Sequence, residues 1–453
     1  MGNKGQETII ISRTDKIGDF VVSIPSYATA RVMFPQAKIV ALVSKHNKIL
    51  AQGLKCVDEV VSIDDYESQD DLVSKLRSLH PDAFVALVSN NNISRLAVRS
   101  GAKRRIGPLS RFWSFFHYNQ GLRQSRSRCL KSEAAYNLDL IRHLDPKRYD
   151  SLAHPCFERI AFSEADAQVV ANYLAQENLS ATPFILVNPF TGGSGANLNC
   201  EQYGQVIASI VTTPHDPTKP LPKRNRRALA TLAPDSVPNS LMESLSSTGS
   251  DSTAIAGSTT IAGSTAAIAG RTGDVASAST SAITSADAAA GASSANTASD
   301  SFSVTMDAAS ALDTSSHKFI YPEVVILAMP CHKEKVELIL AQIPAHARAL
   351  VHCFFNEGSL LVAAALVDRC KVFIGPSTGI TQIAGNYQKR TLCFYSSRIS
   401  NSHRRWELFG DEDEVPFTFD VAKLDYKTRE LTELSPDMGQ SIITTALEEL
   451  WQL

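Results

Sequence analysis

The 453-residue sequence predicts an α/β protein with two doubly wound parallel sheets. Short runs rich in Val and Ile alternate with segments of helical period from residue 7 to about residue 107. The same alternation restarts at Phe184. Between residues 213 and 317 the composition changes completely, which divides the second sheet into two stretches of sequence.

The first alternation is typical of strands that are buried on both faces of a parallel sheet. The apolar runs cover residues 8–12, 38–44, 57–63 and 83–89. The segments of helical period between them cover residues 19–33, 46–53, 69–79 and 92–100. We assign residues 1–175 to one Rossmann-like domain.

The second alternation begins with FILVNPFTGG and continues with a helix near 201–211. It resumes at about residue 318 and runs through KVFIGPSTG and RTLCFYS. Residues 176–212 and 318–436 therefore form a second Rossmann-like domain. Apolar residues at helical spacing predict a C-terminal helix over 437–453.

The insertion at 213–317 begins with a basic stretch rich in Pro and then consists mainly of Ser, Ala, Thr and Gly. It contains too little large apolar surface to offset an ordering cost of roughly 1–2 kcal/mol per residue, so we expect it to be disordered. Its basic cluster is interpreted as a solvated linker, although contact with anionic phospholipid stays open. The cluster consists of Lys219, Lys223, Arg224, Arg226 and Arg227.

The overall charge argues against some classes of partner. Lys and Arg number 44 and Asp and Glu number 46, so the net charge of −2 does not indicate binding to nucleic acid. The eight cysteines form no CxxC pair, which favours reduced, mostly buried thiols in a cytoplasmic protein. The N-terminal segment reaches a charged residue after one short apolar run, so we expect neither a signal peptide nor a membrane span there.

The first candidate site is the turn after the first strand, residues 13–19. Ligands bind at the carboxyl ends of strands in such sheets, and Gly18 would let the backbone come close to one. Lys16 lies on the same turn. Asp19 either accepts a proton from a substrate hydroxyl or is an ordinary acid at a helix N-terminus.

The second candidate site is the loop GPSTGITQIAG, residues 375–385, between a strand and a helix. Its hydroxyls and backbone N–H groups suit a diphosphate, and the alternative is a simple helix cap. A glycine-rich turn at 188–195 follows the first strand of the same domain and supports the diphosphate interpretation. The candidate donor-binding residues of the two loops are Thr191, Gly192, Ser377, Thr378, Gly379 and Thr381.

A basic cluster and an acidic run follow the last strand of the second domain. Arg398, Arg404 and Arg405 either neutralise a phosphate or form a solvated loop. The acidic run at 411–414 has the DxD spacing of some metal sites, but no strand leads into it, so we interpret it as a surface loop.

Several motifs together resemble glycosyltransferase family 9, the family of ADP-heptose:lipopolysaccharide heptosyltransferases. They are KIGD from Lys16, SIP from Ser23, FP at Phe34, FIGPSTGITQIAG, KRTLCFYS and RRWELFG. Their order and spacing extend over nearly the whole chain outside 213–317 and are more specific than any single motif.

The resemblance implies a GT-B architecture, in which two Rossmann-like domains face each other across a cleft. It implies inverting transfer with no metal and no cofactor, from a nucleotide sugar to a lipid-linked glycan. The family's proposed base corresponds to Asp19, with Lys16 and Gly18 on the acceptor side. The expected reaction moves heptose from ADP-heptose onto a lipopolysaccharide core or a related surface glycan. The implied location is the cytoplasm, with peripheral contact at the inner membrane.

The sequence departs from the heptosyltransferase pattern at three places. Ser377 replaces an Asp, Gln382 replaces a His, and the lysine after the glycine-rich turn has no counterpart in residues 195–199. We therefore look to Arg398, Arg404 and Arg405 for the missing cation. The departures leave two alternatives open: a sugar-nucleotide epimerase or hydrolase, and a degenerate protein that only binds nucleotide sugar.

Overall fold

The computed structural model describes residues 6–88, 90–192, 195–216, 319–408 and 415–451. The predicted insertion, its basic cluster and the acidic run at 411–414 lie almost entirely outside these ranges. The two edges of the insertion are described, and they meet. His215 and Ile320 form an antiparallel bridge with N···O distances of 2.8 and 3.0 Å. The chain therefore leaves the second domain and returns to it at the same point.

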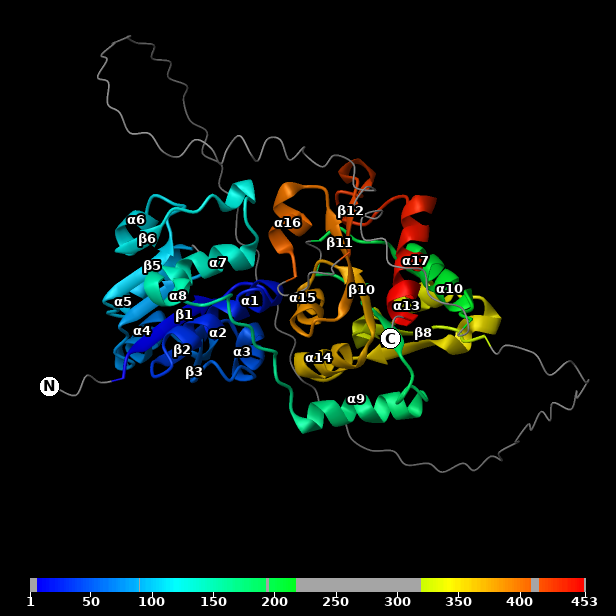
Figure 1. The fold of residues 1–453 in the computed structure, drawn as a ribbon, viewed down its shortest axis with the longest axis horizontal. Coiled ribbons are helices and arrows are strands. Elements are labelled where there is room, and N and C mark those ends of the chain that lie inside the picture. Colours follow the sequence, from blue (N-terminus) through cyan, green and yellow to red (C-terminus); the bar gives the residue numbers. More distant parts are fainter. Residues whose placement is uncertain (1–5, 89, 193–194, 217–318, 409–414, 452–453) are drawn as a thin grey trace, which may run out of the picture. The chain divides into compact units, whose positions relative to one another are not determined.

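The first sheet is parallel throughout and has the strand order β3-β2-β1-β4-β5-β6 (Figure 1). Its strands are β1 Thr8–Arg13, β2 Lys38–Val43, β3 Glu59–Ser62, β4 Ala83–Ala86, β5 Arg104–Pro108 and β6 Gln120–Leu122. The structure confirms the four predicted strands and adds β5 and β6.

The second sheet is also parallel, with the order β12-β11-β10-β7-β8-β9. Its strands are β7 Phe184–Val187, β8 Glu323–Ala328, β9 Val351–Phe355, β10 Val372–Pro376, β11 Arg390–Ser396 and β12 Val415–Phe419. Numbered from its own first strand, this order is the same as that of the first sheet. The sequence therefore encodes one doubly wound topology twice.

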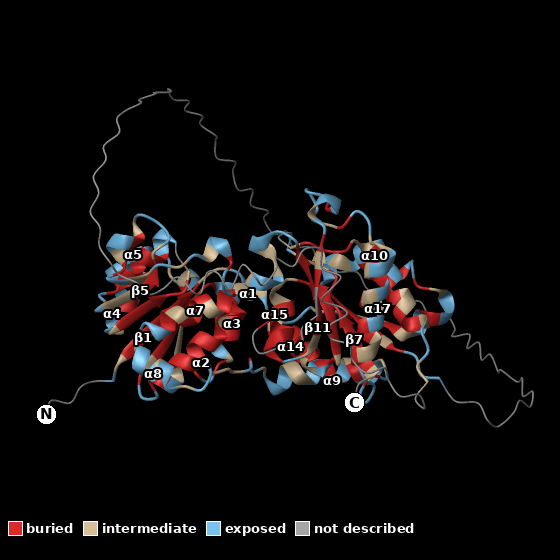
Figure 2. Ribbon diagram, turned by 45° about the horizontal axis from the view of Figure 1, so that its top comes forward, coloured by how far each residue is buried: buried red, intermediate tan, exposed pale blue. Residues whose placement is uncertain are grey.

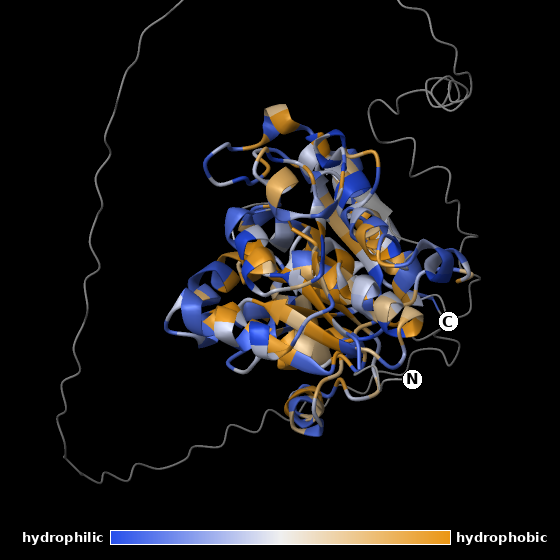
Figure 3. Cartoon of the chain, turned by 90° about the vertical axis from the view of Figure 1, so that its left-hand side faces the viewer, coloured by the Kyte–Doolittle hydropathy of each residue, from blue (hydrophilic) through white to orange (hydrophobic). Residues whose placement is uncertain are grey.

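Helices cover both sheets, and the strands between them are buried (Figure 2). Around the first sheet they are α1 Ile17–Val21, α2 Ile24–Met33, α3 Lys45–Gln52, α4 Gln69–Ser78, α5 Asn91–Arg99, α6 Ser114–His117, α7 Glu133–Arg142 and α8 Pro146–Asp150. After them come α9 Glu164–Gln176, α10 Cys200–Thr212, α13 Lys333–Leu340, α14 Leu360–Arg369, α15 Gly379–Asn386, α16 His403–Trp406 and α17 Pro436–Trp451. The strands carry the hydrophobic colours in Figure 3, as the Val and Ile runs predict.

The single helix predicted over 19–33 is two helices, α1 and α2. Pro25 lies in the first turn of α2, where its missing N–H costs nothing but where a preceding helix cannot continue through it. Ser23 occupies the break and donates its hydroxyl to the Phe20 carbonyl at 2.6 Å. The break leaves α1 as a short helix directly after the first candidate turn.

The segment that joins the two sheets packs against the second one. Helix α9, which the predicted boundary at 175 assigns to the first domain, contacts α14. The stretch before α9 is tied to α15, because Asn386 Oδ1 accepts from Ile160 N at 2.9 Å and Tyr387 donates to the Ile160 carbonyl at 2.7 Å. Within the described ranges, every helix falls short of the length or apolarity that a bilayer crossing requires.

Candidate active site

The candidate loops lie at equivalent points of the two sheets. Strand β1 has β2 on one side and β4 on the other, so the strand order reverses between β1 and β4. In the second sheet the order reverses between β7 and β10. Ligands of open α/β sheets bind at the carboxyl ends of strands at such a reversal. The turn after β1 and the loops after β7 and β10 all occupy these positions.

The turn after β1 is organised by Arg13, the last residue of the strand. Arg13 is 1% exposed although it is charged. Its guanidinium donates to Asp15 at 2.7 Å, to Asp19 at 2.6 Å and to Glu133 at 3.2 Å. A charge this deeply buried requires such partners, so the three carboxylates are part of how the turn folds.

Glu133 connects this turn to two further arginines. It is the first residue of α7, and its side chain is 3% exposed. Its Oε1 accepts from Arg126 at 2.5 Å, and its Oε2 lies 3.4 Å from Nε of Arg405. Burial alone would raise the pKa of Glu133, but Arg126, Arg13 and Arg405 lower it below its usual value. Glu133 is therefore an ionised carboxylate that holds three guanidinium groups together.

Besides Asp15, whose side chain is 30% exposed, Asp19 retains access to solvent. It lies in the first turn of α1, and its side chain is 17% exposed. Burial raises its pKa to about 6, against the opposing effect of the Arg13 guanidinium. A carboxylate with a pKa near neutrality is suited to accept a proton at physiological pH. Geometry and charge therefore allow Asp19 to act as a general base.

The loop after β10 contains no charged side chain and leads into α15. Within the described chain no side chain caps this helix, so its first N–H groups have no side-chain acceptor, and such groups attract anions. The Thr378 hydroxyl lies 3.2 Å from the Thr381 hydroxyl and 3.5 Å from the Asn188 amide. A Cβ added to Gly195 would lie 3.3 Å from the Ser377 carbonyl, so the loops after β7 and β10 are neighbours.

The structure brings the turn after β1 and the loop after β10 together. Helices α1 and α15 pack against each other, as Figure 1 shows. A Cβ added to Gly379 would lie 2.8 Å from Ile17 Cγ2 and 3.3 Å from Gly18 N. Only a residue without a side chain fits at position 379, so Gly379 allows the N-terminus of α15 to reach Gly18.

The structure also shows the surroundings of four other predicted site residues, which are Lys16, Thr191, Gly192 and Thr381. Thr381 is fully buried and donates its hydroxyl to the Pro376 carbonyl at 2.5 Å, so it stabilises the loop. Thr191 and Gly192 lie on the loop after β7, and a Cβ on Gly192 would have no neighbour within 4 Å. Lys16 is exposed just before α1. Direct contacts from these residues to a ligand stay predictions.

The three predicted arginines occupy different environments. Arg405 pairs with Glu133 and stacks on the Trp406 ring at 4.9 Å, whereas Arg398 and Arg404 are exposed. Gln382, which occupies the place of the family's His, donates to the Trp406 carbonyl at 3.0 Å. Helix α16 is thereby fixed to α15 and reaches the carboxylate group of the first sheet.

Sequence reasoning included Arg13 in the candidate turn but gave it no role, and it missed Glu133. Arg13 had a detectable signal, since a charged residue directly after the run TIIIS is unusual in a buried strand. Glu133 had none, because a Glu that follows a capping Ser132 is an ordinary helix start. It lies 120 residues from Arg13, and only the folded chain brings the two together.

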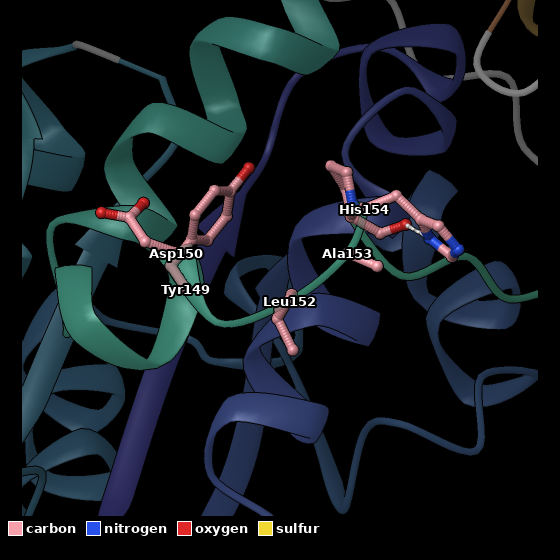
Figure 4. A pocket seen from close by; sticks show the side chains of 6 residues that line it. Tyr149, Asp150, Leu152, Ala153 and His154 are labelled. Carbon is pink, nitrogen blue, oxygen red and sulfur yellow. Dashed lines mark hydrogen bonds between the residues drawn. The ribbon is translucent and has the colours of Figure 1, made fainter.

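A separate hollow of about 290 Å³ lies beyond α8 (Figure 4). It is lined by Tyr149, Asp150, Leu152, Ala153, His154 and Pro155. Asp150 is held by Arg142 at 2.6 Å, and the side chains of Asp150 and His154 point in opposite directions. Because no polar groups converge in it, this hollow is not a candidate active site. Within the described residues no cluster of His, Cys, Asp and Glu is placed to hold a metal ion.

Comparison with solved structures identifies the architecture. The chain is similar to E. coli ADP-heptose lipopolysaccharide heptosyltransferase II, with a TM-score of 0.59 and 13% identity over 98% of both chains. It is similar to a glycosyl transferase of family 9 from Veillonella parvula, with a TM-score of 0.60 and 12% identity over 98% of this chain and 97% of the other. The chain has the fold of these two solved structures. The GT-B architecture predicted from the motifs is confirmed.

Two further comparisons refine this result. E. coli heptosyltransferase WaaC with ADP gives a TM-score of 0.54 and 11% identity over 98% of this chain and 99% of the other. In sequence, the chain is 32% identical over 211 residues to a Haemophilus influenzae protein named "Putative glycosyltransferase". That match spans 45% of this chain and 60% of the relative's length. No protein-family model matches the sequence.

Proposed function

We propose that the protein is an inverting, metal-independent glycosyltransferase with Asp19 as its general base. One observation carries the proposal: a partly exposed carboxylate with a pKa raised to about 6 lies beside the uncapped N-terminus of α15. Deprotonation of an acceptor hydroxyl requires such a carboxylate. A departing nucleotide diphosphate requires N–H donors such as those at the N-terminus of α15.

In the proposed reaction, Asp19 removes the proton from the acceptor hydroxyl as its oxygen attacks the anomeric carbon of the donor. The bond from that carbon to the diphosphate oxygen breaks, and the nucleotide diphosphate leaves with the electron pair. Arg13 keeps Asp19 in place through the 2.6 Å contact. The N–H groups at Gly379 and the hydroxyls of Ser377 and Thr378 would meet the charge that develops on the leaving group.

The first donor and acceptor to test follow from the named relatives. Structures similar to this chain include an ADP-heptose heptosyltransferase and a heptosyltransferase with ADP. We therefore propose heptose from ADP-heptose as the sugar and a lipopolysaccharide core or related lipid-linked glycan as the acceptor. Such an acceptor would place the reaction in the cytoplasm, peripheral to the inner membrane.

The decisive test compares Asp19→Asn with Asp15→Asn in the full chain. Both residues pair with Arg13, but only Asp19 lies in α1 beside α15. We expect Asp19→Asn to lower the transfer rate about 10²–10⁴-fold and Asp15→Asn to lower it less than tenfold. Equal rates in both variants, with the folded state intact, would remove Asp19 from the reaction.

The same assays separate the alternative functions. A screen of nucleotide sugars by thermal shift identifies the donor, because a ligand that binds only the folded state raises the unfolding temperature. Product formed from the donor without any acceptor would indicate an epimerase or a hydrolase. Donor binding without turnover across acceptor extracts would indicate a protein that only binds nucleotide sugar.

A further inference from the structure

The edge of the first sheet carries an exposed aromatic surface on α6 and the residues around it. Phe112 is 81% exposed, Phe116 is 69% exposed and Phe115 is 47% exposed. Leu130, on the segment that returns from β6, is 63% exposed. Isolated exposed apolar residues are ordinary, but here three exposed phenylalanines lie within five residues, and the rings of Phe112 and Phe116 pack together. We call these residues, with the cations described below, the α6 surface.

The outward orientation of these rings is fixed by what the same helix buries. Tyr118 is buried and its ring fills the space above Gly107, where an added Cβ would lie 2.4 Å away. His117 Nδ1 is hydrogen-bonded to the Ser94 hydroxyl of α5 at 2.7 Å. Phe112 and Phe116 lie edge to face, with ring centroids 5.2 Å apart. The phenylalanines therefore face solvent because the opposite side of α6 is already committed to packing.

The stretch of chain that carries this patch is rich in positive charge and has no acid of its own. From residue 110 to residue 132 the sequence contains five Lys or Arg residues and no Asp or Glu. Arg111, Arg123 and Arg128 are exposed, and no carboxylate among the described residues pairs with them. The Arg123 guanidinium lies 5.6 Å from the centroid of the Phe115 ring. The protein as a whole is nearly neutral, at −2, so this concentration is local.

Aromatic rings among unpaired arginines match the chemistry of an anionic membrane surface. The rings enter the boundary between headgroups and acyl chains, and the arginines meet the lipid phosphates. A second copy of the chain would bring like charges together at the same patch. The basic cluster of the insertion, Lys219 to Arg227, is also positively charged, so it is a poor candidate to bind the α6 surface.

We propose that the α6 surface docks the protein on anionic phospholipid. The proposal does not depend on the proposed transferase activity. The same segment continues to Arg126, which donates to Glu133 at 2.5 Å, so docking here would hold the candidate active site next to the bilayer. The sequence alone had suggested only the cluster at 219–227 for such contact.

Cosedimentation of the full chain with vesicles tests the proposal. Vesicles of phosphatidylglycerol and phosphatidylethanolamine are compared with vesicles of phosphatidylcholine. We expect binding to the anionic vesicles that weakens as salt rises. R111Q/R123Q/R128Q should lower the partition coefficient on the order of 100-fold. F112S/F116S should lower it about tenfold or more.

Matched variants elsewhere on the surface serve as controls. K147Q/K335Q/K427Q removes the same charge, and L338S/Y426S removes side chains that are 56% and 62% exposed. Both should bind like the unaltered chain, and all variants should keep the unfolding temperature. The proposal is overturned if the unaltered chain ignores the charge of the vesicles or binds neither kind. It is also overturned if only replacement of the cations at 219–227 abolishes binding.

Discussion

The turn after β1 and the loop after β10 occupy equivalent positions in two sheets of the same strand order, yet their chemistry is opposite. The first is built from charge: Arg13, Asp15, Asp19 and Glu133 lie within one hydrogen-bonded group. The second is built from hydroxyls and backbone N–H groups, with no charged side chain between Pro376 and Asn386. One topology therefore carries two loops of different chemistry, and the proposed function assigns a different task to each.

The charged turn should be the more fragile of the two. Arg13→Leu leaves Asp19 and Glu133 without their shared cation, and breaking a buried pair in this way should lower the free energy of unfolding by about 3–5 kcal/mol. Urea denaturation measures it. Arg398→Leu is the control and should change stability by less than about 0.5 kcal/mol, since Arg398 is exposed. If both variants lowered the free energy of unfolding equally, Arg13 would contribute no more to stability than an exposed arginine.

The approach of the two regions depends on Gly379. Gly379→Ala places a methyl group 2.8 Å from Ile17 Cγ2, which should cost about 1–3 kcal/mol of stability. Gly192→Ala, where the added atom has no neighbour within 4 Å, is the matched control and should be nearly neutral. Both are measured by thermal unfolding. A neutral Gly379→Ala would mean that α15 and Gly18 do not meet as described.

The second sheet has a charged group of its own, but it lies at the outer strand β9. His352 lies 2.6 Å from Glu177 and 2.9 Å from Glu323, and these carboxylates raise the pKa of His352 above its ordinary value. Its contribution to stability is therefore complete below about pH 6.5 and is lost as pH rises through the raised pKa.

We expect His352→Gln to destabilise the protein by about 1–2 kcal/mol at pH 6 and by less at pH 8. His346→Gln, on an exposed residue, is the control and should change stability by less than about 0.5 kcal/mol. Urea denaturation at the two pH values measures both. If His352→Gln lowered the free energy of unfolding more at pH 8 than at pH 6, the assignment of a positive charge to His352 would be wrong.

The hydroxyl loop should affect binding more than turnover. Thr378→Val removes the hydroxyl beside Asn188 and should weaken binding of the donor about 5- to 10-fold, as expected for one hydrogen bond. Asp19→Asn should leave donor affinity nearly unchanged. Isothermal titration calorimetry with ADP-heptose, or with the donor found by thermal shift, measures both. If Asp19→Asn weakened donor binding and Thr378→Val did not, the donor would bind at the turn after β1 and not at the loop after β10.

The fold was predictable because burial determines the strands, and the exceptions have physical causes. Strand β5 begins with two arginines, and β6 has three residues, so neither shows an apolar run. Strand β12 contains Pro416, a residue that a sheet tolerates at its edge but that argues against a strand in the sequence. The helix over 19–33 was predicted as one because its apolar period continues across the break before Pro25.

The positions of the candidate loops were predictable, but the network behind them was not. Each loop follows a strand at which the order of its own sheet reverses, which made both positions predictable, but the approach of Gly379 to Gly18 joins two different sheets. Glu133 and Arg405 meet across elements whose packing no local pattern encodes. The predicted role of the three arginines depended on that packing, which gives Arg405 a carboxylate partner and leaves Arg398 and Arg404 exposed.

The pH dependence of transfer tests the central claim most directly. Because the pKa of Asp19 is raised to about 6, kcat/KM should fall about tenfold per pH unit below pH 6 and level off above pH 7. The residual activity of Asp19→Asn should lack this inflection. A profile that stays flat from pH 5 to pH 8, or an inflection that survives in Asp19→Asn, would contradict the account.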